Sequence, residues 1–111
     1  MKLSEIVQKL DLTIFAGEKF LDKEVTGGYV SDLLSDVMGY SAEGEIWITL
    51  QTHKSVMAIA SLKELAAVIL VKGFKPDDDT IKHAENEEIP ILGTHKKTFE
   101  ISGELYNLLN S

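Results

Sequence analysis

The sequence predicts an α/β fold, namely a three-layer α/β/α domain in which helices cover both faces of a mainly parallel β-sheet. The first observation is that three short apolar runs, at residues 46–50, 67–71 and 89–92, each end abruptly in polar residues. The second is that segments of helical length and period separate these runs. Such strand–helix–strand alternation forms right-handed crossovers and therefore parallel strands.

Composition agrees with one globular domain over residues 1–111. The chain is long enough to bury a core, and its 44% hydrophobic and 26% charged residues are ordinary for a globular protein. It contains no cysteine, which excludes disulfides, thiolate metal sites and cysteine nucleophiles.

The charge and the hydropathy of the chain limit the kinds of partner and the cellular compartment that we expect. The net charge is −7 without a basic cluster, which argues against nucleic acid, because nucleic-acid binding depends on neutralising phosphates. No apolar run of membrane-spanning length occurs, and the N-terminus lacks the apolar core of a signal peptide. We therefore expect a cytoplasmic protein with no membrane segment.

Local patterns predict the first elements. Apolar residues recur at helical spacing at Leu3, Ile6, Val7 and Leu10. They predict a short amphipathic helix with Ser4 as its N-cap. β-branched and aromatic residues at 12–15 then predict a strand, and residues 18–23 a polar connection.

Two adjacent glycines, Gly27 and Gly28, predict a turn between a brief strand and a helix over residues 31–37. Glycines placed before a helix can present backbone N–H groups to an anion, which makes this pair a candidate for the outer part of a ligand site. The alternative is a tight turn in which glycine only supplies a positive φ.

The pattern of residues 53–63 predicts a helix that is apolar nearly all round, although the same residues are also compatible with a strand. One face carries Val56, Ile59, Ala60 and Lys63, and the opposite side carries Met57, Ala58 and Leu62. A helix of this kind is buried on two sides, and in so small a domain the second side suggests another subunit. With Tyr29, Val30 and Met38 expected at the surface, the pattern predicts a homodimer. The alternative is that the final helix covers this side.

The last part of the chain predicts two more helices. Pro76 followed by Asp77, Asp78 and Asp79 marks a helix start, in which an aspartate caps free N–H groups. A divalent cation is the alternative use of these carboxylates, although they lack the spacing of a calcium loop. The final helix spans residues 99–109 and is expected to close the core through Phe99, Ile101, Leu105, Tyr106, Leu108 and Leu109.

Candidate ligand-binding residues follow the three central strands. They are Gln51, Thr52, His53 and Lys54 after the first strand, Gly73 after the second and Thr94 after the third. Ligands of parallel sheets bind beyond the carboxyl ends of the strands, and these donors suit a phosphate or another anion. The alternative is that they are ordinary polar loop residues.

The sequence contains no recognisable catalytic machinery. It lacks the Gly-x-x-x-x-Gly-Lys-Ser/Thr phosphate loop, the Gly-x-Ser-x-Gly elbow and the Gly-x-Gly-x-x-Gly dinucleotide motif. His53 and His95 follow two strands of one sheet and are expected to face one another. Two imidazoles without a third ligand do not define a metal site. We therefore predict no catalytic residue, no metal site and no cofactor.

Between about residues 12 and 109 the chain resembles a DRTGG domain, most strongly at residues 66–76 and 89–94. The run 27–34 resembles the short stand-alone members of that family. The resemblance implies a fold like that of the N-terminal, non-catalytic domain of HPr kinase/phosphorylase. It also implies a regulatory role, because such domains accompany CBS domains in regulatory proteins and nucleotide-controlled pyrophosphatases.

The chain departs from the family motifs. The Gly-Asp-Arg of the family corresponds to Gln51, Thr52 and His53, and its Thr-Gly-Gly corresponds to residues 71–73, where only Gly73 is retained. Thr26 with its two following glycines spells the triplet ahead of the first central strand. A role for the missing aspartate and arginine therefore does not transfer to this chain.

Two functional hypotheses follow. The first is a non-catalytic regulatory module that senses an adenine nucleotide or another small anion, or acts through a partner protein. The second is a small phosphotransfer enzyme related to HPr kinase, for which the chain lacks a phosphate loop.

Overall fold

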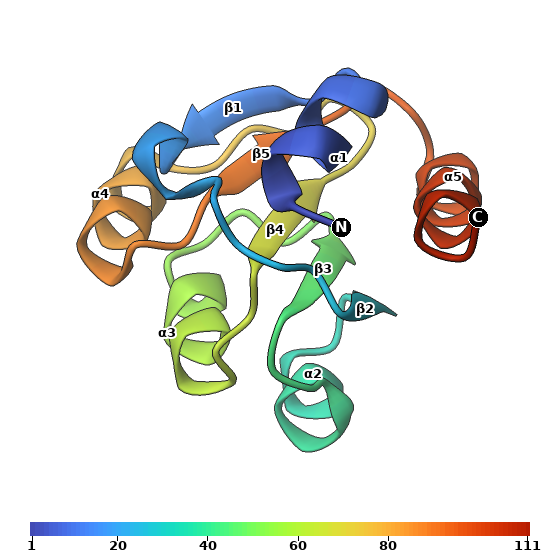
Figure 1. Ribbon diagram of the computed structural model, residues 1–111. Coiled ribbons are helices and arrows are strands. Elements are labelled where there is room, and N and C mark those ends of the chain that lie inside the picture. Colours follow the sequence, from blue (N-terminus) through green and yellow to red (C-terminus); the bar gives the residue numbers. More distant parts are fainter.

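The computed structural model describes residues 1–111 and is built around a five-stranded sheet with the strand order β1-β5-β4-β3-β2 (Figure 1). The strands are β1 (Thr13–Ala16), β2 (Gly27–Val30), β3 (Glu45–Thr49), β4 (Ala67–Leu70) and β5 (Ile91–Gly93). Strands β2, β3, β4 and β5 are parallel to one another, and only β1 is antiparallel to its partner, β5. The prediction of a mainly parallel sheet is confirmed.

Helices cover both faces of the sheet. They are α1 (Leu3–Lys9), α2 (Leu34–Tyr40), α3 (Ser55–Leu62), α4 (Asp78–Glu87) and α5 (Thr98–Leu109), with a short 3₁₀ helix, η1, at Glu18–Phe20. Figure 1 shows α1 and α5 on one face and α2, α3 and α4 on the other. This arrangement confirms the three-layer prediction.

Two hydrophobic clusters, one on each face, explain why the layers form. Side chains alternate along a strand, so Ile46 and Ile48 pack with the α1 and α5 cluster, while Trp47 packs with the cluster of the other three helices. The strands are buried on both faces, which accounts for the continuous apolar runs of the sequence.

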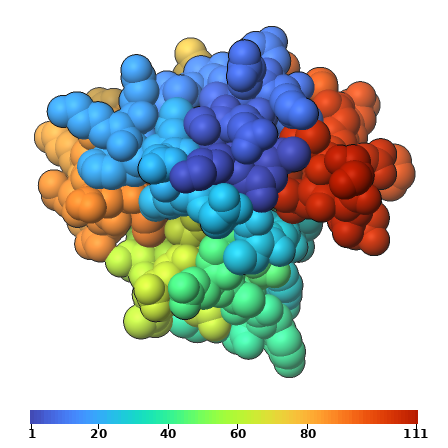
Figure 2. Space-filling model, in the orientation of Figure 1, coloured from blue at the N-terminus to red at the C-terminus, as the bar shows by residue number.

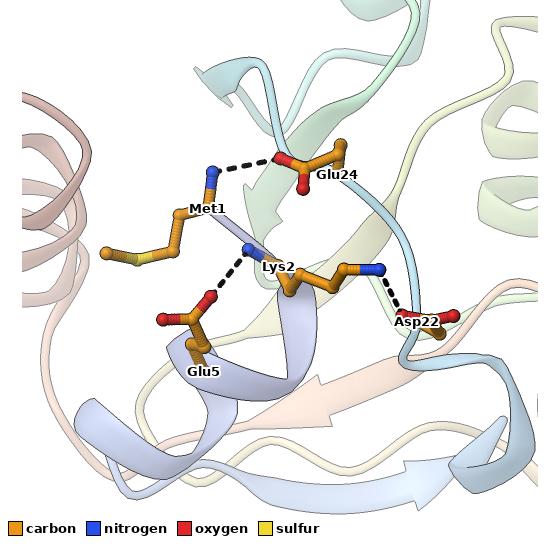
Figure 3. A network of polar contacts seen from close by, with 5 residues as sticks. All are labelled: Met1, Lys2, Glu5, Asp22 and Glu24. Atoms are coloured by element: carbon orange, nitrogen blue, oxygen red, sulfur yellow. Dashed lines mark hydrogen bonds and ion pairs between the residues drawn. The ribbon is translucent and has the colours of Figure 1, made fainter.

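The start of α1 differs from its prediction. The N-cap is Lys2, whose N–H donates to Glu5 Oε1 at 3.2 Å, so Ser4 lies inside the helix. Figure 3 shows the contacts at this end of the chain: the Met1 amine pairs with Glu24 at 3.0 Å, and the Lys2 side-chain amine pairs with Asp22. These contacts tie the N-terminus to the segment that leads into β2.

The predicted glycine turn is wrong. Gly27 and Gly28 lie within β2, neither has a positive φ, and α2 begins at Leu34 rather than near residue 31. A Cβ atom at Gly28 would lie 3.2 Å from Leu105 Cδ2. At that position glycine serves the close approach of α5 to the strand.

The surroundings of α3 also differ from the prediction. Met57 is completely buried inside the chain, because α2 and α4 pack on either side of α3. Only Ala58 and Leu62 remain exposed on the second side. The suggested cover by the final helix is wrong, since α5 packs against β2 and β3 on the opposite face. Within α5, Ile101 and Leu105 close the core, whereas Phe99 is 90% exposed.

Candidate functional site

The carboxyl ends of β3, β4 and β5 form one edge of the sheet. Thr49 pairs with Leu70, and Leu70 pairs with Gly93, so the three strands end at the same level. Six predicted ligand-binding residues follow these ends: Gln51, Thr52, His53, Lys54, Gly73 and Thr94. The other two, Gly27 and Gly28, pair with Glu45 and Ile46 at the amino end of β3. They therefore lie away from this edge.

Asp32 holds the end of β3 in place, although sequence reasoning did not select it. Its Oδ1 atom accepts hydrogen bonds from the Thr49 hydroxyl at 2.7 Å and from the Leu50 N–H at 2.9 Å. The Gln51 Nε2 donates to the Asp32 carbonyl at 2.9 Å. The amide of Gln51 is thus already engaged within the chain. The available signal was an aspartate just after a strand, a residue that commonly bonds nearby backbone.

Hydrogen bonds also connect the loop after β3 to the start of α4. The Thr52 carbonyl accepts hydrogen bonds from the Asp77 N–H at 3.2 Å and the Thr80 hydroxyl at 2.8 Å. Asp77 is the N-cap residue of α4, but its side chain makes no cap hydrogen bond. Its Oδ2 atom lies 3.0 Å from His53 Nδ1 instead. One of the three aspartates predicted at this helix start therefore pairs with a predicted ligand-binding histidine.

His53 and Lys54 line an open hollow of about 520 Å³, which we call the aspartate pocket. Its residues are His53, Lys54, Ser55, Asp77, Asp78 and Asp79. Three carboxylates face a single ammonium group and one imidazole, so the local charge opposes a bound anion. No group of three His, Cys, Asp or Glu side chains in the chain is arranged to hold a metal ion.

The ends of β4 and β5 form a second hollow of about 260 Å³, which we call the Gly73 pocket. Its lining residues are Thr13, Phe15, Gly73, Phe74, Lys75, Gly93, Thr94 and His95. No acidic side chain is among them. A hollow of about 350 Å³ adjoins it, shares Thr13, Thr94 and His95, and adds Lys96 and Asp11.

Backbone hydrogen bonds hold the two loops of the Gly73 pocket together. Lys72 and Gly73 both have left-handed backbone conformations, with φ values of 58° and 75°. Their N–H groups donate to the carbonyls of Lys96 and Thr94, each at 2.9 Å. Two backbone hydrogen bonds therefore join the loops after β4 and β5 into one unit.

Glycines let two side chains pack closely on this unit. A Cβ atom at Gly73 would lie 2.9 Å from His95 Nδ1, and one at Gly93 would lie 2.9 Å from Phe15 Cζ. His95 thus lies over Gly73, while His53 lies beside Asp77 in the aspartate pocket. The two histidines line different pockets, and the expectation that they face one another is wrong.

Comparison with known proteins identifies the family to which the chain belongs. A family model of the DRTGG domain matches residues 5–108. The chain is 30% identical over 106 residues to the "Uncharacterized protein YtoI" of Bacillus subtilis (strain 168), a match that covers 89% of this chain but 22% of that protein.

A solved structure has the same fold. It contains the CBS and DRTGG domains of the regulatory region of Clostridium perfringens pyrophosphatase, complexed with the activator diadenosine tetraphosphate. The similarity has a TM-score of 0.67 at 19% identity and covers 94% of this chain and 45% of the other. The chain therefore spans less than half the length of both of these proteins. None of its helices combines the length and hydrophobicity needed to cross a membrane. With nearly the whole chain matched by the family model and the same fold found in a solved member, this protein belongs to the DRTGG domain family.

Proposed function

We propose that this chain is a non-catalytic regulatory module that binds an adenine nucleotide or a similar anion in the Gly73 pocket and acts through a partner protein. One observation carries the proposal. In a chain of net charge −7, the Gly73 pocket is lined by Lys75 and His95 and by no acidic side chain. Of the residues predicted from the sequence, Gly73 and Thr94 belong to this pocket.

The charge around the pocket supports an anionic ligand. The two loops that form it contain four of the chain's lysines, at positions 72, 75, 96 and 97. Lys96 is paired with Glu104, whereas no ion pair engages Lys75. A phosphate group would gain a favourable interaction with Lys75 here, while in the aspartate pocket it would meet three carboxylates.

The shape and polarity of the pocket support a nucleotide in particular. Phe74 is 46% exposed at the rim and offers an aromatic face on which a base can stack. The Thr94 hydroxyl provides a hydrogen-bonding group beside it. The adjoining hollow extends the space along the loop of residues 94–96 and leaves room for the sugar, while the phosphate would lie beside Lys75 in the Gly73 pocket.

Calorimetric titration with ATP, ADP, AMP and diadenosine tetraphosphate tests the proposal, with thermal unfolding as a second readout. A ligand at 100 times its dissociation constant is expected to add about 2.7 kcal/mol to the free energy of unfolding. Lys75→Ala is expected to weaken binding about tenfold, equivalent to about 1.4 kcal/mol. Lys82→Ala, on the exposed surface of α4, is the matched control and is expected to leave affinity unchanged.

A further variant distinguishes nucleotide binding in the Gly73 pocket from binding in the aspartate pocket. Lys54→Ala removes the only ammonium group of the aspartate pocket. If this change weakens nucleotide binding and Lys75→Ala does not, the ligand binds beside His53 and the proposed location is wrong. Failure of all four nucleotides to bind at millimolar concentration would remove the ligand-sensing proposal altogether.

The pairing of His53 with Asp77 is the one observation that favours the rival phosphotransfer function. A carboxylate within 3.0 Å of an imidazole is an arrangement found in general bases. The chain lacks a phosphate loop to position ATP for such a base. Incubation with labelled ATP and candidate acceptors tests the rival, and transfer that is lost in His53→Ala would establish it.

We also propose that the module forms a homodimer through the surface of α2 and α3. These two helices pack side by side and expose Met38, Tyr40 and Leu62. Exposed apolar side chains that cluster on one surface commonly mark an interface, and a twofold axis allows such a patch to cover itself.

A further inference from the structure

The outer edge of β2 is open. β2 is the last strand of the sheet and pairs only with β3. Beyond its end, the Ser31 N–H donates to the Ile48 carbonyl at 3.3 Å. Because successive residues of a strand direct their peptide groups to opposite edges, Gly28 and Val30 direct theirs outward, away from β3. The strand thus presents free N–H and C=O groups in the pattern that another strand would pair with.

This edge lacks the features that usually prevent pairing. The opposite edge strand, β1, has an irregular register between Ile14 and Ala16. β2 runs in unbroken register with β3 over four residue pairs and contains neither lysine nor proline. Edge strands are normally protected by bulges, charges or proline. An edge strand without these features is suited to accept a partner strand.

A pocket of about 390 Å³ lies beside this edge, between β2 and α5. Its lining residues are Thr26, Gly27, Gly28, Val30, Glu45, Ile48, Ser102, Leu105, Tyr106, Leu109 and Asn110. Val30 and Tyr106, at 48% and 69% exposure, are accessible apolar contacts. The buried hydroxyl oxygen of Ser102 has no hydrogen-bond partner. Figure 2 shows the surface of α5, in red, meeting the segment around β2, in cyan, on the side of the molecule that carries this pocket.

The segments that form the edge contain acidic side chains and no basic ones of their own, and of these acids Glu24 and Glu104 pair with the Met1 amine and Lys96. Residues 24–52 contain no lysine or arginine, and neither do residues 98–111 of α5 and the C-terminus. The two segments together carry seven acidic residues: Glu24, Asp32, Asp36, Glu43, Glu45, Glu100 and Glu104. A second copy paired at this edge would bring the same acids face to face, whereas a basic segment would complement them.

We propose that the β2 edge is a docking site at which an extended, basic and apolar segment of a partner protein adds to the sheet as a further strand. Main-chain hydrogen bonds to Gly28 and Val30 would hold the segment, and an apolar side chain would enter the pocket under α5. Lysines or arginines of the segment would face Glu45 and its acidic neighbours. This docking site rests on the proposed regulatory function, since it is where the partner protein of the module would bind. Its test uses no nucleotide, so a failure to bind the peptide and a failure to bind nucleotide can be told apart.

The test uses the isotope-labelled full chain and two short blocked peptides. One alternates valine with lysine, and the other alternates valine with glutamate. Heteronuclear NMR titration is expected to show the basic peptide shifting the amide signals of Gly28 and Val30 and the methyl signals of Leu105. The acidic peptide is expected to leave these signals in place. Val30→Lys is expected to weaken binding of the basic peptide at least about tenfold, equivalent to about 1.4 kcal/mol.

Control variants show whether a basic peptide or a second copy of the chain binds at the β2 edge. Asn86→Lys places the same charge on the exposed surface of α4 and is expected to leave binding unchanged. The proposal is overturned if the basic peptide does not bind, if its shifts map to the aspartate pocket, or if Val30→Lys binds as well as the parent. It is also overturned if the chain alone is a dimer that Val30→Lys converts to a monomer, because a second copy then occupies the edge.

Discussion

Asp32 and Thr49 are joined by a hydrogen bond of 2.7 Å that connects the loop after β2 to the end of the neighbouring strand β3. The same carboxylate oxygen accepts the N–H of Leu50 at 2.9 Å. Thr49 is buried, so its hydroxyl has no access to water as an alternative partner. The loop that leads to His53 and Lys54 is therefore set by a side chain that lies 17 residues earlier than Thr49.

Asp32→Ala is expected to lower the free energy of unfolding by about 1–3 kcal/mol, because it leaves the buried Thr49 hydroxyl and the Leu50 N–H without their acceptor. Urea denaturation measures the change. Asp32→Asn retains an acceptor oxygen and is expected to recover most of the loss. If Asp32→Asn unfolds as easily as Asp32→Ala, the negative charge rather than the hydrogen bonds stabilises this loop.

Gly73→Ala is expected to destabilise the chain by about 1–2 kcal/mol, since Gly73 has a left-handed conformation that costs L-residues this much. The new methyl group would also meet His95 Nδ1 at 2.9 Å and displace the imidazole from the pocket. Thermal unfolding measures the stability, and the NMR signals of His95 report its displacement. Adding His95→Ala is expected to relieve the steric part of the loss and leave the conformational part. Full recovery in the double variant would show that the backbone conformation carries no penalty.

Gly93→Ala and Gly103→Ala are expected to change stability in opposite directions. At Gly93 the methyl group would meet the Phe15 ring, with its Cζ atom 2.9 Å away, and overpacking of this kind costs about 1–3 kcal/mol. At Gly103, within α5, nothing lies within 4 Å of the new Cβ atom. Alanine there is expected to stabilise the helix by about 0.5–1 kcal/mol. Chemical denaturation of both variants checks the pair, and a loss of stability in Gly103→Ala would contradict the packing seen around α5.

Met57→Glu and Leu62→Glu separate folding from self-association. Met57 is fully buried, so a glutamate there is expected to unfold the chain rather than dissociate a dimer. Leu62 is 67% exposed, and its replacement is expected to leave the fold intact, as judged by circular dichroism. Light scattering at micromolar concentration is expected to give a dimer mass for the parent and a monomer mass for Leu62→Glu. A monomeric parent would contradict the proposed dimer.

The elements that local patterns predicted well are those in which neighbouring residues alone carry the signal. The strands β3, β4 and β5 lie within one or two residues of their predicted bounds, because a strand buried on both faces needs a continuous apolar run. Neighbouring residues also carried the signals for the start of α4 after Pro76 and for the amphipathic helix α1. Their alternation along the chain was enough to predict parallel strands, since crossovers in such sheets have one hand.

Errors arose where a residue's role depends on a distant part of the chain. Gly27 and Gly28 have the local composition of a turn, yet they form a strand because β3 pairs with them and α5 packs closely over Gly28. Phe99 has the hydrophobicity of a core residue, but it lies on the solvent side of α5, whose orientation is decided by Ile101 and Leu105.

The candidate site shows the same division. By itself the sequence determined the parallel sheet and the edge to which Gly73 and Thr94 belong, because the carboxyl ends of parallel strands meet at one edge. Only the tertiary structure decided that this edge is divided into two pockets of different charge. The loop after β3 contacts Asp77 through His53. The loops after β4 and β5 are joined by backbone hydrogen bonds and contain several lysines. Contacts between residues far apart in the sequence set these surroundings, and the pattern of any single segment does not contain them.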